Sequence, residues 1–110
     1  MKRSLIVYTN NSEKYIGKLI ESIMEQLDET KEDLIIVDDL STDNTIPIIV
    51  NTIGYFFTDE DHYKLFINTV PKGKKDSIEM AKKIAKGDFK FIINKRKRIN
   101  KSIWRGTCFN

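Results

Sequence analysis

The stretch Leu34–Thr45, LIIVDDLSTDNT, contains the features that decide the fold of this chain. Its first four residues form an apolar, strand-like run that leads directly into two adjacent carboxylates, Asp38 and Asp39. A polar turn follows, and a new apolar-periodic segment begins at Ile46. In open α/β sheets, ligands bind outside the carboxyl ends of the strands, where a strand gives way to a helix. The stretch therefore predicts an α/β domain with both carboxylates at its ligand-binding edge.

Strand-like and helix-like segments alternate on both sides of this stretch. Apolar spacing predicts helices that begin at residue 11 or 12, at residue 43 or 44, and at residue 74, with stops near Leu27, Gly54 and Lys86. Strands are expected at residues 5–8, 34–37, 63–68 and 89–93. The order βαβαβαβ with apolar strands predicts a three-layer, Rossmann-like α/β fold. We expect a mainly parallel four-stranded sheet with helices on both faces.

Composition is that of an ordinary soluble globular domain, with 40% hydrophobic and 32% charged residues. No apolar run is long enough to span a bilayer. Met1-Lys2-Arg3 leads directly into a strand without a cleavage-site pattern, so we expect no signal peptide and a cytoplasmic location. The single cysteine, Cys108, excludes an internal disulfide framework.

Charge is distributed unevenly along the chain, although the net charge is only +3. Residues 1–61 carry 5 Lys and Arg against 13 Asp and Glu, whereas residues 62–110 carry 14 against 3. The basic run 94–98, NKRKR, begins a basic C-terminal tail, residues 94–110. Three interpretations stay open for this run: a solvated tail, a cationic substitute for a metal ion, and a surface for nucleic acid or an acidic partner.

Three motifs give the chain a resemblance to a known family. They are Tyr8–Asn11 leading into Glu13–Ile16, the central Val37–Thr45, and Ala85–Phe89 before the last strand. With these motifs, residues 1–93 resemble the N-terminal, nucleotide-binding half of the family 2 glycosyltransferases, which adopt the GT-A fold. The resemblance implies binding of a nucleotide-diphosphate sugar, with a UDP-sugar among the candidates.

The resemblance also implies roles for single residues. Thr9 and Asp39 would contact the base, with Asp38 beside them, and Asp43 is more suited to capping the second helix. The full predicted nucleotide-binding set is Thr9, Asn11, Asp38, Asp39 and Ser41. Candidate phosphate-binding residues are Lys72, Lys74, Lys95 and Arg96.

Departures from the family pattern bear on activity. Tyr8 replaces a proline and Leu40 a glycine. The family's Asp-x-Asp, which holds Mn²⁺ or Mg²⁺, aligns with residues 94–96, Asn-Lys-Arg, which cannot supply the oxygen ligands that hard cations need. The family's catalytic base lies in a following acceptor-binding half, so no catalytic residue is assigned. We therefore expect a truncated glycosyltransferase-like protein with reduced or no transferase activity on its own.

An alternative is a catalytically inactive remnant that acts as a protein- or nucleic-acid-binding module through its basic C-terminal face. Nucleic acid is the less favoured partner. The strand at 89–93 would also leave an apolar edge, since a truncated sheet has no further strand to pair with it. Either residues 99–109 cover this edge, or the protein forms homo-oligomers through it.

Overall fold

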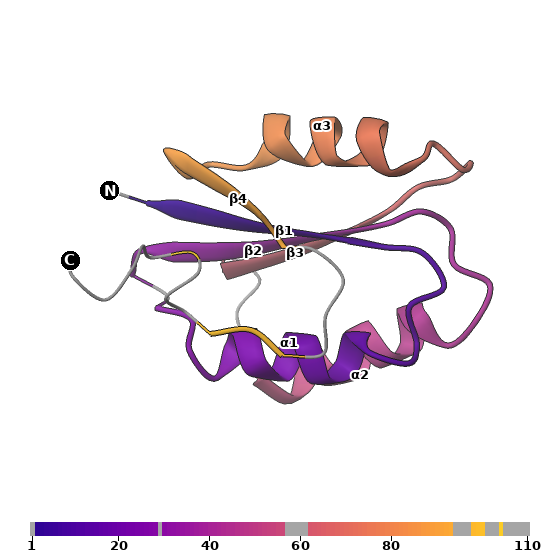
Figure 1. Ribbon diagram of the computed structural model, residues 1–110, viewed down its shortest axis with the longest axis horizontal. Coiled ribbons are helices and arrows are strands. Elements are labelled where there is room, and N and C mark those ends of the chain that lie inside the picture. Colours follow the sequence, from indigo (N-terminus) through magenta and orange to yellow (C-terminus); the bar gives the residue numbers. More distant parts are fainter. Residues whose placement is uncertain (1, 29, 57–61, 94–97, 101–103, 105–110) are drawn as a thin grey trace.

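The computed structural model describes residues 2–28, 30–56, 62–93, 98–100 and 104. In these residues, strands and helices alternate along the chain (Figure 1). The elements are β1 (Arg3–Thr9), α1 (Ile16–Met24), β2 (Glu32–Asp38), α2 (Thr45–Phe56), β3 (Tyr63–Ile67), α3 (Lys74–Ile84) and β4 (Phe89–Ile93).

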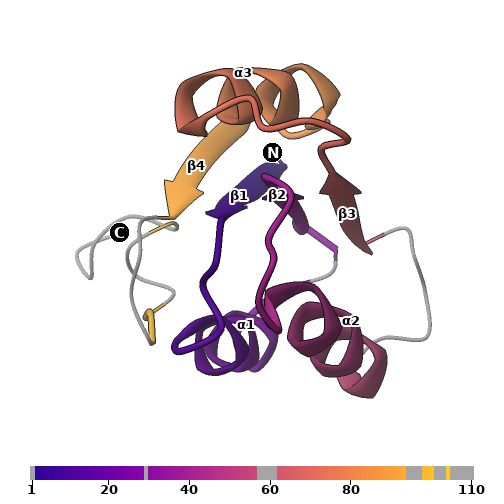
Figure 2. The same ribbon diagram turned by 90° about the vertical axis from the view of Figure 1, so that its right-hand side faces the viewer.

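The four strands form one parallel sheet in the order β3-β2-β1-β4. Helix α3 covers one face of this sheet, and α1 and α2 cover the other (Figure 2). The predicted three-layer α/β fold is therefore confirmed. The chain moves outward from β1 through β2 to β3 and then returns to the other side of β1 for β4. The direction of winding thus reverses between β1 and β4, which makes this the topological switch point of the sheet.

The two central strands, β1 and β2, carry the core. Their side chains alternate between the faces, so each strand contributes to both layers. The larger apolar cluster lies between the sheet and α1 and α2, and it includes Leu5, Leu34 and Ile36. The smaller cluster, with Ile6 and Ile35, lies beneath α3. None of the three described helices has the length and apolarity that a membrane crossing requires.

Four predicted helix boundaries were wrong. Helix α1 ends at Met24 rather than near Leu27, where the Asp28 N–H donates to the Glu32 carboxylate (2.8 Å). Helix α1 begins at Ile16, because Asn11 has a left-handed backbone (φ 48°) that a right-handed helix cannot continue from. Helix α2 runs through Gly54 to Phe56, since Gly54 does not adopt the left-handed conformation that ends many helices. Helix α3 ends at Ile84, two residues before the predicted stop, and Ala85 is already extended.

Two residues beyond β4 pack into the core on the α1 side of the sheet. Ile99 and Trp104 are both buried in the larger apolar cluster. The Ile99 N–H donates to Ser22 Oγ (3.1 Å), and Gln26 Nε2 donates to the Ile99 carbonyl (2.7 Å). Trp104 Nε1 donates to the buried Glu32 carboxylate (2.8 Å). Ile99 therefore contacts α1, and Trp104 contacts β2.

The outer edge of β4 has no strand partner among the described residues. Most of the segment predicted to cover it, residues 101–103 and 105–109, lies outside the described residues. Both the cover and self-association through this edge stay predictions.

Replacing Gly87 by alanine tests the contact between β1 and the turn before β4. A Cβ at Gly87 would lie 2.6 Å from the Ser4 amide nitrogen and 2.7 Å from its Oγ, which accepts the Gly87 N–H. We expect Gly87→Ala to lower the free energy of unfolding by about 1–3 kcal/mol. Gly54→Ala is the control: its Cβ meets nothing within 4 Å, so it should stabilise α2 by up to about 1 kcal/mol. Urea unfolding measures both, and equal effects would contradict this account.

Candidate functional site

Asp38, the last residue of β2, is a fully buried carboxylate whose partners come from two other segments. Thr9 Oγ1, at the end of β1, donates to Asp38 Oδ1 (2.6 Å). The Ser41 hydroxyl donates to the same oxygen (2.6 Å), and the Ser41 N–H donates to Oδ2 (2.8 Å). Asp38 therefore holds the ends of β1 and β2 and the following turn together.

Asp39, the next residue, is also buried and accepts four hydrogen bonds. Tyr8 Oη and the Gly73 N–H donate to Oδ2 (3.0 and 2.9 Å). Asn68 Nδ2 and the Lys72 N–H donate to Oδ1 (2.9 and 2.8 Å). A carboxylate has room for about four donors, so these contacts fill its acceptor capacity. Asp39 thus joins the ends of β1 and β3 to the loop that leads into α3.

These contacts set the protonation states of both partners. Burial alone would raise the pKa of Asp39, but the hydrogen bonds from Lys72, Asn68, Gly73 and Tyr8 outweigh it and lower the pKa below its usual value. Burial, followed by the hydrogen bond to Asp39 and the negative charge of that carboxylate, raises the pKa of Tyr8 to about 12. At neutral pH, Asp39 is ionised and the Tyr8 hydroxyl is a donor.

The turn after Asp39 is held by Asn11 from the end of β1. Asn11 Oδ1 accepts the N–H groups of Thr42 (2.8 Å) and Asp43 (3.3 Å), and the Asn11 N–H donates to Ser41 Oγ (2.8 Å). The Asp43 carboxylate accepts the N–H of Thr45, the first residue of α2, at 2.9 Å. Asp43 therefore caps α2, as predicted.

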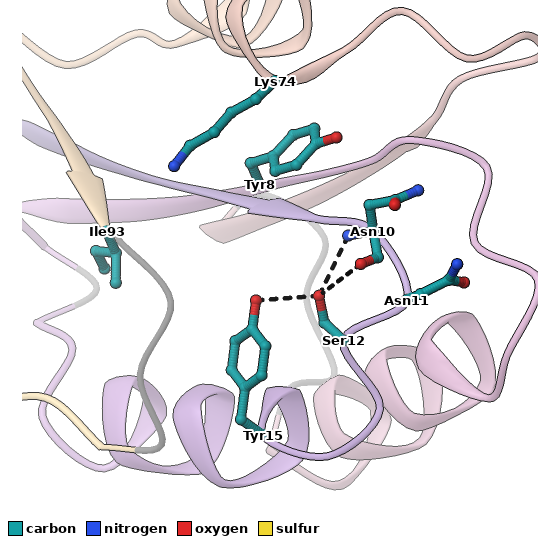
Figure 3. A pocket seen from close by; sticks show the side chains of 7 residues that line it. All are labelled: Tyr8, Asn10, Asn11, Ser12, Tyr15, Lys74 and Ile93. Carbon is teal, nitrogen blue, oxygen red and sulfur yellow. Dashed lines mark hydrogen bonds between the residues drawn. The ribbon is translucent and has the colours of Figure 1, made fainter.

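A pocket of about 260 Å³ opens at the carboxyl ends of β1 and β4 (Figure 3). Lys74 extends above it from the start of α3, and Tyr15 rises from the start of α1 below, where its hydroxyl donates to Ser12 Oγ (3.0 Å). The pocket therefore lies at the switch point between β1 and β4. Its lining residues are Tyr8, Asn10, Asn11, Ser12, Tyr15, Lys74 and Ile93.

The structure brings some of the predicted site residues to this pocket and not others. Asn11 and Lys74 line it. Lys72 is exposed, and its backbone rather than its side chain contacts Asp39. Four predicted residues have partners within the protein and are not among those that line the pocket: Thr9, Asp38, Asp39 and Ser41. Lys95 and Arg96 lie outside the described residues. The ligand contacts of all nine stay predictions.

Sequence reasoning missed several residues of the site. Tyr8 was noted only as a substitution, although it both lines the pocket and bonds Asp39. Asn68 directly follows β3, and a polar residue at the carboxyl end of a strand was the signal that could have found it. Ser77 carried no signal: it is a buried polar residue in α3 that accepts from Asn68 Nδ2 (2.9 Å).

Whether this chain can hold the divalent metal ion of the family depends on the side chains that would coordinate it. Residues 94–96 offer one amide oxygen and two cationic side chains, which repel a cation. Within the described part of the chain, no group of three or more His, Cys, Asp or Glu side chains could hold a metal ion. The residues present therefore do not fit a Mn²⁺ or Mg²⁺ site of the family type.

Comparison with known proteins agrees with the fold. The pattern of glycosyl transferase family 2 matches residues 4–95. In open α/β sheets, ligands bind at the topological switch point, which is where the pocket lies. The chain belongs to glycosyl transferase family 2.

Among its relatives is the poly(ribitol-phosphate) β-N-acetylglucosaminyltransferase TarS of Staphylococcus aureus. TarS is 34% identical over 105 residues, which cover 92% of this chain and 17% of TarS. The structure of a TarS fragment in complex with UDP-GlcNAc superimposes with a TM-score of 0.79 at 32% identity, over 96% of this chain and 29% of that one. The mannosyltransferase PcManGT of Pyrobaculum calidifontis, in complex with GDP-Man and Mn²⁺, gives a TM-score of 0.68 at 26% identity. That match covers 79% of this chain and 25% of PcManGT.

Leu40 lies in a strained turn, which makes a stabilising substitution possible. Its φ is 57°, a conformation that costs a residue with a Cβ about 1–2 kcal/mol. We expect Leu40→Gly to raise the free energy of unfolding by about 0.5–1 kcal/mol, since glycine's greater freedom in the unfolded chain offsets part of the relief. Leu40→Ala keeps the strain and should give no gain in urea unfolding. A lower stability for Leu40→Gly than for wild type would show that the Leu40 side chain matters more than its backbone.

Asp39→Asn tests the charge at the centre of the site. Asparagine offers one acceptor oxygen to four donors, so we expect a loss of about 2–4 kcal/mol in the free energy of unfolding at pH 7. Because the pKa of Asp39 is lowered by folding, its stabilisation is complete above about pH 4, the unfolded value, and is lost as the pH falls through the folded value. The gap between wild type and variant should therefore shrink on acidification toward pH 3. Urea unfolding across this range measures it, and a gap that does not change with pH would contradict the assignment.

Proposed function

We propose that this chain binds a nucleoside-diphosphate sugar in the pocket at the carboxyl ends of β1 and β4. The observation that carries the proposal is the position of this pocket at the switch point of a parallel sheet. Its walls come from the end of β1, the start of α1, the start of α3 and the end of β4. Two aromatic rings, amide and hydroxyl groups and one lysine therefore face one space, a mixture that suits a base, a sugar and a diphosphate.

Support for a uridine nucleotide comes from the relatives. TarS structures contain UDP and UDP-GlcNAc, and these structures match this chain at 32–33% identity. We therefore take a UDP-sugar as the first candidate ligand. GDP-mannose, which is bound in the structure of the more distant PcManGT, is the second.

We assign to this chain the binding of the nucleotide sugar, not the complete glycosyl-transfer reaction. No carboxylate or histidine is among the described residues that line the pocket, so they include no evident general base. The chain also spans only 17% of the length of TarS. We assign sugar transfer to this chain only in combination with an acceptor-binding half.

We assign the Tyr8 ring to contact with the base and the polar side chains of Asn10, Asn11 and Ser12 to the ribose and sugar. Aromatic side chains stack on bases of any kind, because every base has a π face. Asp39 is assigned a positioning role: it orients Tyr8 and the loop before α3. A base N–H would reach this carboxylate only by displacing one of its four donors.

Isothermal titration with UDP, UDP-GlcNAc and GDP-mannose tests the proposal. We expect UDP-GlcNAc or UDP to bind and to stabilise the fold; ligand at ~100 times its Kd adds about 2.7 kcal/mol. Tyr8→Ala should weaken binding about 5- to 150-fold, the range of 1–3 kcal/mol for one stacked base. Tyr8→Phe keeps the ring and should retain most of the affinity. Tyr55→Ala is the matched control, because Tyr55 is an exposed tyrosine on α2 away from the pocket.

Absence of binding by every nucleotide sugar to the folded wild-type protein would overturn the proposal. Equal losses for Tyr8→Ala and Tyr55→Ala would keep nucleotide binding but remove it from this pocket. The melting temperature of each unliganded variant shows that loss of binding is not loss of fold.

A further inference from the structure

We propose that the Lys74 ammonium group neutralises the diphosphate of the ligand, so that this chain binds a nucleoside diphosphate without a divalent metal ion. The inference rests on the proposed function and extends it to the way in which the diphosphate is recognised. A nucleoside diphosphate brings several negative charges into the pocket, and these need a positive partner. Residues 94–96 do not fit the metal ion that would otherwise supply the positive charge.

The position of Lys74 suits this role. Lys74 is the first residue of α3, and its side chain extends across the pocket toward Ile93, the last residue of β4 (Figure 3). Ile93 directly precedes Asn94, where the metal-binding motif is replaced. The ammonium group therefore lies on the side of the pocket where β4 ends. In the sequence, the position of the family's metal-binding Asp-x-Asp follows directly.

The electrostatics of the pocket also favour an anion. Among the described residues that line it, Lys74 is the one charged side chain. The nearby carboxylates of Asp38 and Asp39 are buried outside the lining, and both accept hydrogen bonds from groups of the protein. Lys74 has no ion-pair partner within the described part of the chain. Its charge is thus available to a ligand.

The two backbone N–H groups directly before α3 are already engaged by Asp39. Helix N-termini often bind anions through their free N–H groups. Here, however, the N–H groups of Lys72 and Gly73 both donate to Asp39. The N–H of Ser77 is bonded to the Gly73 carbonyl. Among the described residues that line the pocket, the side chain of Lys74 is the one that carries a full positive charge.

Isothermal titration of UDP, in EDTA and separately with Mn²⁺, tests the inference on wild type, Lys74→Gln and Lys75→Gln. Lys75 is the matched control because it is an adjacent, exposed lysine that does not line the pocket, and its substitution changes the net charge equally. We expect wild type to bind UDP equally with and without Mn²⁺. Lys74→Gln should weaken UDP binding by about tenfold or more, whereas Lys75→Gln should change it by less than about twofold. Lys74→Arg should recover most of the loss.

Uridine separates a contact with the diphosphate from a general effect on the pocket. Its affinity should be the same in wild type and Lys74→Gln, because it carries no phosphate. A parallel loss for uridine, equal losses in Lys74→Gln and Lys75→Gln, or a wild-type affinity for UDP that rises tenfold with Mn²⁺ would each overturn the inference. UDP binding that is unchanged in Lys74→Gln overturns this inference alone. Absence of all nucleotide binding overturns the proposed function as well.

Discussion

The burial of two adjacent carboxylates at the end of β2 is the constraint on which the rest of the site depends. An ionised carboxylate without partners is very costly away from water, so each group needs donors in fixed positions. Asp38 takes its donors from Thr9 and Ser41. Asp39 takes them from Tyr8, from Asn68 and from the loop before α3. Segments far apart in the chain are thereby held at one edge of the sheet.

This arrangement separates the residues that support the site from those that line the pocket. The charged residues that the sequence makes most prominent lie behind the wall of the pocket, while the wall itself is aromatic, amide, hydroxyl and lysine. Tyr8 connects the buried carboxylates to the wall of the pocket, because its hydroxyl donates to Asp39 and its side chain lines the pocket. The lowered pKa of Asp39 keeps the carboxylate ionised, which in turn keeps the Tyr8 hydroxyl and the loop in place. A rigid supporting layer of this kind limits the reorganisation that ligand binding requires.

A second buried carboxylate centre lies at the opposite end of β2. Glu32 accepts from Trp104 Nε1 and from the Asp28 N–H (2.8 Å each), and Arg3 lies 3.7 Å away. Glu32 therefore links Arg3 in β1 and Asp28, which precedes β2, to Trp104, which lies beyond β4. Strand β2 is thus anchored by charge at both ends and by apolar contacts in between. Strand β2 is buried along its whole length because it has a strand on each side and helices on both faces of the sheet.

Much of the fold followed from local pattern, since strand and helix periods are properties of neighbouring residues. Strand β4 and the start of α3 were predicted to the residue. The start of α1 was not predictable in the same way, because Asn11 takes a left-handed backbone to bond the turn at residues 41–43, which is a tertiary contact. Gly54 likewise looked like a stop, yet α2 continues past it to Phe56.

By itself, the sequence determined the parallel α/β class, the family, and the replacement of the metal-binding acids by Asn-Lys-Arg. These depend on residue type and spacing along one chain. Only the tertiary structure decided which polar residues are supports and which face the pocket. That distinction depends on which donors from β1, β3 and the loop before α3 reach Asp39, and these residues are 29 to 34 positions away along the chain. No local pattern encodes such distances, because they are set by the packing of whole strands.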